Sequence, residues 1–241
     1  MNKTAQRICV WTGPAMLALW AGSWVFVADF IPPIAPGKSA AEVAEFYRDH
    51  IDGIRVGMIL GLFASALLAP FAVVIAAQMR RIEGPRAVLS QVQLLSGALL
   101  SLEFIVPIMV FQAAAYRIED QSDQVIQGFN DLGWLLFVGV ISTILMQVIA
   151  IGIVVLIDRR EKPIFPRWVG YFNLWMAVGL FPAGLVPLVK DGPFAWNGAL
   201  SFYIPLTAFA LWIIVMTWVM LRVVNDDELE DSAPRDARLE R

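Results

Sequence analysis

One carboxyl group stands where the sequence is otherwise apolar. Glu103 lies in LLSLEFIVPIMVF, the segment from Leu99 to Phe111, among aliphatic and aromatic side chains and beside a polar neighbour no larger than Ser101. A carboxylic acid in such surroundings is expected to be protonated, unless a cation or several hydrogen-bond donors reach it. An ionisable side chain within an apolar helix predicts a functional site, which could take up a proton or bind a polar group.

A proline four residues further on adds a second polar group at the same place. Pro107 has no N–H, so the carbonyl of Glu103 is left without its helical partner. Gln147, near the middle of a later apolar segment, is the predicted side-chain partner of Glu103. We expect these three residues to form a ligand-binding site. Its rim is expected to carry three charged residues, Asp29, Asp131 and Lys190.

A purely structural role for Glu103 fits the same residues. A protonated Glu103 hydrogen-bonded to Gln147 would hold two helices together, and such bonds in membranes contribute about 0.6 to 2 kcal/mol. Three other prolines favour a cavity, because Pro182, Pro187 and Pro205 all fall in the predicted outer halves of their spans. Pro70, in the predicted inner half of the second span, is the exception. Freed carbonyls are tolerated in a membrane where they are buried in protein or line a cavity. The sequence therefore predicts an outward-facing vestibule with Glu103 at its floor.

Composition places these residues in a membrane protein. Of the 241 residues, 59% are hydrophobic and 16% are charged, whereas soluble domains are about 45–50% apolar and about 25% charged. The fold class predicted is all-α, with six transmembrane helices, because only helices satisfy their own backbone in lipid within a single segment of this length. The spans predicted are 9–31, 54–79, 87–115, 132–157, 168–189 and 199–223. They form one domain, 1–224, followed by a charged, disordered cytoplasmic tail, 225–241.

The basic residues predict the orientation. Lys and Arg gather at the N-terminus, in the 80–86 and 158–167 loops and from residue 222 onward. By the positive-inside rule, both termini are in the cytoplasm, and a bacterial cytoplasmic membrane is the expected location. In the first outer loop, Ser39 and Glu42 have capping-box spacing and open an amphipathic helix. We expect this helix to lie on the outer surface as a packing lid; the alternative is a gate.

Missing residue types limit the chemistry. A single cysteine, Cys9, rules out an intramolecular disulfide, and a single histidine, His50, rules out bis-histidine haem within one chain. No Walker motif, dinucleotide fingerprint or basic block for nucleic acid is present. We expect no cofactor, no metal site and no catalytic residues. An enzyme acting on lipids would have to use four residues predicted at the outer surface, Asp29, Asp49, His50 and Asp131.

Two functions remain open from the sequence. The first is an integral membrane protein that binds or transports a small ligand through an outward-facing intramembrane cavity centred on Glu103. The alternative is a non-catalytic accessory subunit or assembly factor of a membrane complex. The nine tryptophans and the GMILG segment, in which Gly57 and Gly61 present a surface for close helix packing, favour this alternative. The expected partners are the lipid bilayer, a small ligand, and a second copy of the chain or another membrane protein.

Overall fold

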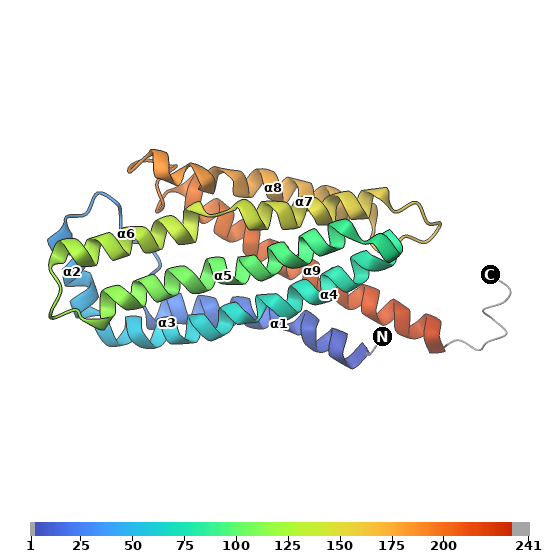
Figure 1. The fold of residues 1–241 in the computed structure, drawn as a ribbon, viewed down its shortest axis with the longest axis horizontal. Coiled ribbons are helices and arrows are strands. Elements are labelled where there is room, and N and C mark those ends of the chain that lie inside the picture. The colour runs from blue at the N-terminus through green and yellow to red at the C-terminus, as the bar shows by residue number, and fades with distance from the viewer. Residues whose placement is uncertain (1–2, 233–241) are drawn as a thin grey trace.

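The computed structural model describes residues 3–232, which form an elongated bundle of helices (Figure 1). Six segments are long and apolar enough to cross a membrane, and the part of the chain described contains no strand. The prediction of an all-helical, multi-pass membrane protein is therefore confirmed. The six segments are Lys3–Val27, Ile51–Arg86, Val88–Tyr116, Asp123–Ile157, Arg167–Leu188 and Ala199–Asp226.

Most of these spans contain more than one helical element. The first consists of α1 (Lys3–Gly22) and a π-helical turn, η1 (Ser23–Val27), and the second of α3 (Ile51–Ala66), α4 (Leu68–Glu83) and a short 3-10 turn, η2 (Gly84–Arg86). The third is the single helix α5 (Val88–Tyr116). The fourth is divided into α6 (Asp123–Gly139) and α7 (Ser142–Ile157). The fifth joins α8 (Arg167–Leu180) to the 3-10 helix η3 (Phe181–Leu188), and the sixth joins the π-helical turn η4 (Ala199–Tyr203) to α9 (Ile204–Ser232).

Helix α5, which carries Glu103, packs between the second and the fourth spans. It contacts α3, α4, α6 and α7, while α1 packs against α3, α4 and α9, and α8 packs between α7 and α9. The loop helix α2 (Ala40–Asp49) lies at one end of the bundle, and α1 begins and α9 ends at the other (Figure 1). We call these the α2 end and the terminal end.

An aromatic cluster fills the bundle between its middle and the α2 end. The ring of Trp24 lies 4.5 Å from that of Trp20, 5.9 Å from that of Trp134 and 5.8 Å from that of Phe111. Lipid is as apolar as these side chains, so van der Waals packing rather than water exclusion holds such a cluster together inside a membrane. Aromatic pairs contribute about 0.5–1.5 kcal/mol each beyond the area they bury. The cluster gives η1, α5 and α6 a common, rigid wall.

The helical backbone is irregular mainly near the middle of the bundle and in its α2 half. Proline accounts for several of these positions: Pro70 follows the break at Leu67, η3 contains Pro182 and Pro187, and Pro205 follows η4. Each proline removes one backbone N–H from the helical ladder. Helix α5 continues through Pro107 without a break. The terminal half is more regular, so any cavity formed by irregular backbone is expected toward the α2 end.

The start of the C-terminal tail differs from that predicted. The disordered tail is predicted to begin at residue 225, but α9 continues to Ser232. Residues 233–241 of the predicted tail lie outside the described residues. Helix α2 begins with the capping box of Ser39 and Glu42 and buries Val43, Ala44 and Tyr47. It packs against α6.

The GMILG segment makes an internal contact. A methyl group added to Gly57 would lie 2.7 Å from Cβ of Ala28 and 2.8 Å from the carbonyl oxygen of Ser23. A methyl group on Gly61 would lie 3.0 Å from Nε1 of Trp24. The two glycines therefore let α3 approach the end of the first span closely, and this surface is not free for a second protein.

We predict that Gly57→Ala destabilises the protein by about 1–3 kcal/mol, because the new methyl group meets backbone atoms that cannot rotate away. The matched control is Gly22→Ala, since no atom lies within 4 Å of a methyl group at that position. Unfolding in detergent would give both free energies. Equal stability of the two variants would contradict the close packing of α3 on the first span.

The capping box of α2 predicts that the stability of the first turn of this helix depends on pH. The hydrogen bond from Lys38, followed by those from the backbone N–H and hydroxyl of Ser39, lowers the pKa of Glu42 from 4.5 to about 2. Because the folded pKa is lowered, the stabilisation is present above pH 4.5 and is lost as the pH falls toward 2. We expect amide exchange of the first turn of α2 to accelerate over this interval relative to Glu42→Gln. Gln keeps the capping geometry and does not titrate. Identical pH profiles of the two proteins would contradict the assignment.

Candidate functional site

The fourth span is interrupted close to Glu103. The chain leaves the helical conformation at Val140 and Ile141, between the end of α6 and the start of α7. Gly139 is flexible, Val140 and Ile141 are β-branched, and Ser142 and Thr143 favour helix starts over helix interiors. Ile141, at the N-cap position of α7, offers no side-chain hydrogen bond. The first N–H groups of α7 are thus left without partners from their own span.

Glu103 supplies the missing cap from another helix. The hydroxyl of Thr143 donates a hydrogen bond to Oε1 of Glu103, and the backbone N–H of Thr143 also donates to this carboxyl group. The start of a helix carries a partial positive charge, which a carboxylate complements. Glu103 therefore does for α7 what an N-cap residue of the same chain segment normally does. This arrangement explains why a carboxyl group occurs within an apolar helix.

The prediction that Gln147 is the side-chain partner of Glu103 is wrong, because Thr143 donates the hydrogen bond. Gln147 lies one helical turn beyond Thr143 on α7, and its amide nitrogen approaches Gly97 rather than Glu103. The shorter Thr143 takes the position next to the carboxyl group because the break brings the first turn of α7 opposite Glu103. If the fourth span were a continuous helix, its residue spacing would not place Thr143 next to Glu103.

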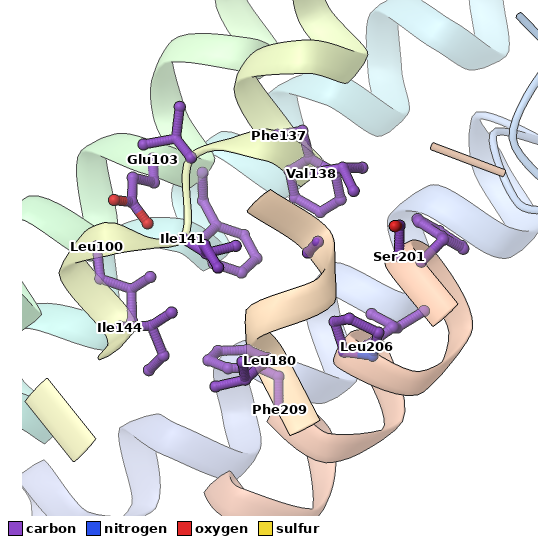
Figure 2. A pocket seen from close by; sticks show the side chains of 15 residues that line it. Leu100, Glu103, Phe137, Val138, Ile141, Ile144, Leu180, Ser201, Leu206 and Phe209 are labelled. Atoms are coloured by element: carbon purple, nitrogen blue, oxygen red, sulfur yellow. The ribbon is translucent and has the colours of Figure 1, made fainter. Parts of the chain in front are cut away.

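A cavity of about 80 Å³ lies beside Glu103. Figure 2 shows Glu103 and Leu100 at one edge, Ser201 and Leu206 at the opposite edge, and the thin, non-helical chain segment leading to Ile141 close to Glu103. Glu103 and Ser201 are the only polar residues among those that line it. The others are Leu100, Phe104, Phe137, Val138, Val140, Ile141, Ile144, Leu180, Ala183, Phe202, Pro205, Leu206 and Phe209.

The walls of the cavity are held by contacts among the lining residues and with residues outside the cavity. Phe137 stacks on Trp20 at 5.4 Å, and the ring of Phe104 lies 5.4 Å from that of Phe209. The hydroxyl of Ser201 donates to the carbonyl oxygen of Pro182 at 3.0 Å, which ties η4 to η3. The cavity therefore lies where the irregular parts of three spans meet α5. Its surface is mostly apolar, with one carboxyl and one hydroxyl group at its edges.

The other predicted site residues do not line this cavity. Pro107 is buried within α5, one turn from Glu103. Asp131 accepts a hydrogen bond from the Asn130 amide at 3.2 Å and is within electrostatic reach of Lys190. The carboxyl group of Asp29 lies 3.4 Å from Nε2 of His50. The structure thus brings Asp131 and Lys190 together toward the α2 end, but neither with Glu103.

Helix α2 reaches the neighbourhood of Asp131 through Tyr47. The Tyr47 hydroxyl donates to Oδ1 of Asn130 at 3.4 Å. Burial, together with the negative charge of Asp131, raises the pKa of Tyr47 well above its ordinary value. Tyr47 is therefore a neutral hydrogen-bond donor that fastens α2 to α6. Within residues 3–232, no three His, Cys, Asp or Glu side chains are grouped so that they could hold a metal ion.

Several residues of the site had only weak signals in the sequence. Thr143 and the break follow from the GVIST segment, in which a glycine, two β-branched residues and two hydroxyl residues all reduce helix propensity. Ser201 and the phenylalanines that line the cavity are of residue types that occur in any membrane span. Comparison with protein-family models, curated proteins and solved structures finds no match to this chain.

The cap predicts a specific effect of two substitutions at one position. Thr143→Val keeps the branched shape but removes the hydroxyl donor. We therefore expect the free energy of unfolding to fall by about 0.6–2 kcal/mol, the range for interhelical hydrogen bonds in membranes. Thr143→Ser keeps the donor and should retain most of that stability. Unfolding of both variants in the same detergent would measure the difference. If Val and Ser at this position gave equal stability, the hydroxyl would not support the cap.

Proposed function

We propose that this integral membrane protein binds or transports a small ligand in the cavity beside Glu103. The observation that carries the proposal is the coincidence of a broken span, a capping carboxyl group and a cavity at one place. Irregular backbone at membrane depth is tolerated where it is buried in protein or lines a cavity. In many transporters, the substrate site is formed near the middle of the bilayer by helices broken in this way.

The lining supports a mainly apolar ligand with one hydrogen-bonding group. Thirteen of the residues around the cavity are apolar, and its two polar groups, on Glu103 and Ser201, are separated by these apolar side chains. Ligand sites typically combine apolar walls with a few polar groups that fix orientation. A ligand that donates a hydrogen bond to Glu103 competes with Thr143 for the same carboxyl oxygens. Ligand binding and the cap of α7 are thereby coupled.

The orientation proposed follows from charge. Arg80 and Arg81 lie in the last turn of α4, and Arg159 and Arg160 follow α7, all toward the terminal end. The positive-inside rule then assigns the terminal end to the cytoplasm of a cell membrane, with a bacterial cytoplasmic membrane as the proposed location. The α2 end and the cavity half of the bundle would face outward. The accessory-subunit alternative loses the support of GMILG, because Gly57 and Gly61 are covered within the chain.

Ala183 offers a test that separates ligand binding from folding. It lines the cavity and is buried, so Ala183→Leu places its additional methyl groups in the cavity space. We expect native mass spectrometry of protein extracted gently from its own membrane to show a bound small molecule. Ala183→Leu should lose this molecule and keep the stability of the unaltered protein, because the larger side chain fills existing space.

The control is Ala64→Leu. Ala64 is also buried but lies on α3, outside the cavity lining. Overpacking at this position should lower the free energy of unfolding by about 1–3 kcal/mol and leave the bound molecule in place. If the unaltered protein carried a stoichiometric unlike protein and no small molecule, the accessory role would replace ligand binding, and Glu103 would be a structural cap only.

A further inference from the structure

Two glutamines in the terminal half of the bundle have polar atoms without partners. Gln93 on α5 is 0% exposed, and within the described chain neither its amide oxygen nor its amide nitrogen has a hydrogen-bond partner. Gln147 on α7 is 2% exposed, and its amide oxygen is likewise unpartnered among these residues. Buried amide groups in proteins are almost always paired, either with protein groups or with ordered water. In a membrane an unpaired amide costs several kcal/mol.

Both glutamines face one junction of three helices. A methyl group on Gly97 of α5 would meet Cβ of Ala72 on α4 and would lie 3.0 Å from Nε2 of Gln147 on α7. Gln93 precedes Gly97 by four residues and so lies on the same face of α5, one turn nearer the terminal end. Helix α4 also contacts α7 directly. Gln93 and Gln147 therefore belong to the same α4–α5–α7 junction.

This junction has a carboxyl group at each end. Toward the terminal end, Ser90 is three residues before Gln93, is fully buried, and donates its hydroxyl hydrogen to Glu83. The carboxyl group of Glu83 also accepts from the backbone N–H of Leu89 at 2.9 Å. Toward the middle of the bundle, Thr143 lies one turn from Gln147 and donates to Glu103. Polar side chains thus recur at intervals of about one turn between Glu83 and Glu103.

The interval suits bridging water. One helical turn rises about 5.4 Å, and two hydrogen bonds of about 2.8 Å through one water molecule cover a similar distance. Each amide group in the junction can both donate and accept, so it can orient a water molecule on either side. Apolar side chains at these positions would leave no such sequence of partners.

We propose that water molecules occupy the α4–α5–α7 junction and form a proton path between Glu103 and the terminal end. Neighbouring waters in this junction pass the proton directly from one to the next. The amide groups of Gln93 and Gln147 only orient these waters and stay neutral, so only the carboxyl groups at the ends change protonation. The ligand cavity and the water path then reach Glu103 from opposite halves of the bundle. That the path serves coupled transport rests on the proposed function, whereas its hydration does not.

Cysteine labelling tests the hydration directly. In protein with Cys9→Ser, the variants Gln93→Cys and Gln147→Cys would be exposed to a small, water-soluble methanethiosulfonate reagent in membranes. The controls are Val148→Cys and Val155→Cys, since both residues are 0% exposed on α7, carry apolar side chains and lie on a different face of α7 from Gln147. We expect at least about tenfold faster labelling at the glutamine positions, because the thiolate that reacts forms only where water is present. Equal rates at all four positions would overturn the proposal.

Infrared spectroscopy tests the proton path and does not depend on the folding of cysteine variants. The carboxyl band of Glu103 is assigned by its loss in Glu103→Gln, and its shift is followed after transfer to D₂O. We expect exchange to be about tenfold slower when Gln93→Leu and Gln147→Leu remove the polar groups that orient the water. An unchanged rate in the double variant, or exchange in the unaltered protein as slow as that of core amides, would overturn the path. Neither result depends on a ligand, so failure here leaves the cavity proposal to its own test.

Discussion

The requirement that every backbone polar group inside a membrane has a partner governs this structure. A continuous helix meets that requirement by itself, but the fourth span is interrupted at Val140 and Ile141 and cannot. Glu103 meets it from α5, by accepting from the hydroxyl and the backbone N–H of Thr143. The carboxyl group also complements the partial positive charge at the start of α7. The break and the buried acid therefore supply each other's hydrogen-bond partners.

The same requirement explains why the two halves of the bundle differ. Toward the α2 end, η1, η3 and η4 depart from α-helical geometry, and aromatic contacts such as Trp24 with Trp134 supply the packing that holds them. A mostly apolar cavity remains where these elements meet α5. Toward the terminal end, the helices are more regular, and the polar groups are side chains, Gln93 and Gln147, instead of freed backbone. Glu103 lies where these two kinds of polar environment meet.

Features that depend on composition could be predicted from the sequence, whereas those that depend on a helix break could not. Six spans follow from long apolar runs, and Glu103 stands out because its type is unfavourable in lipid. The partner of Glu103 could not be predicted, since assuming a continuous fourth span favours Gln147 over Thr143. Propensity differences at Val140 and Ile141 are only fractions of a kcal/mol, too small to decide between a helix and a break without the contacts of α5 and η3.

The cap makes the structural role of Glu103 compatible with the role in ligand binding proposed for it. An ionised carboxylate complements the start of α7 fully, whereas a protonated one keeps a hydrogen-bond acceptor but loses the attraction between charge and dipole. Protonation, or a ligand that draws the carboxyl oxygens away from Thr143, therefore weakens the hold of α5 on α7. Because α7 packs extensively on α8, a change at its first turn can be passed to the side of the bundle that borders the cavity. A structural cap placed at a broken helix is for this reason also the group best placed to respond to a proton or a ligand.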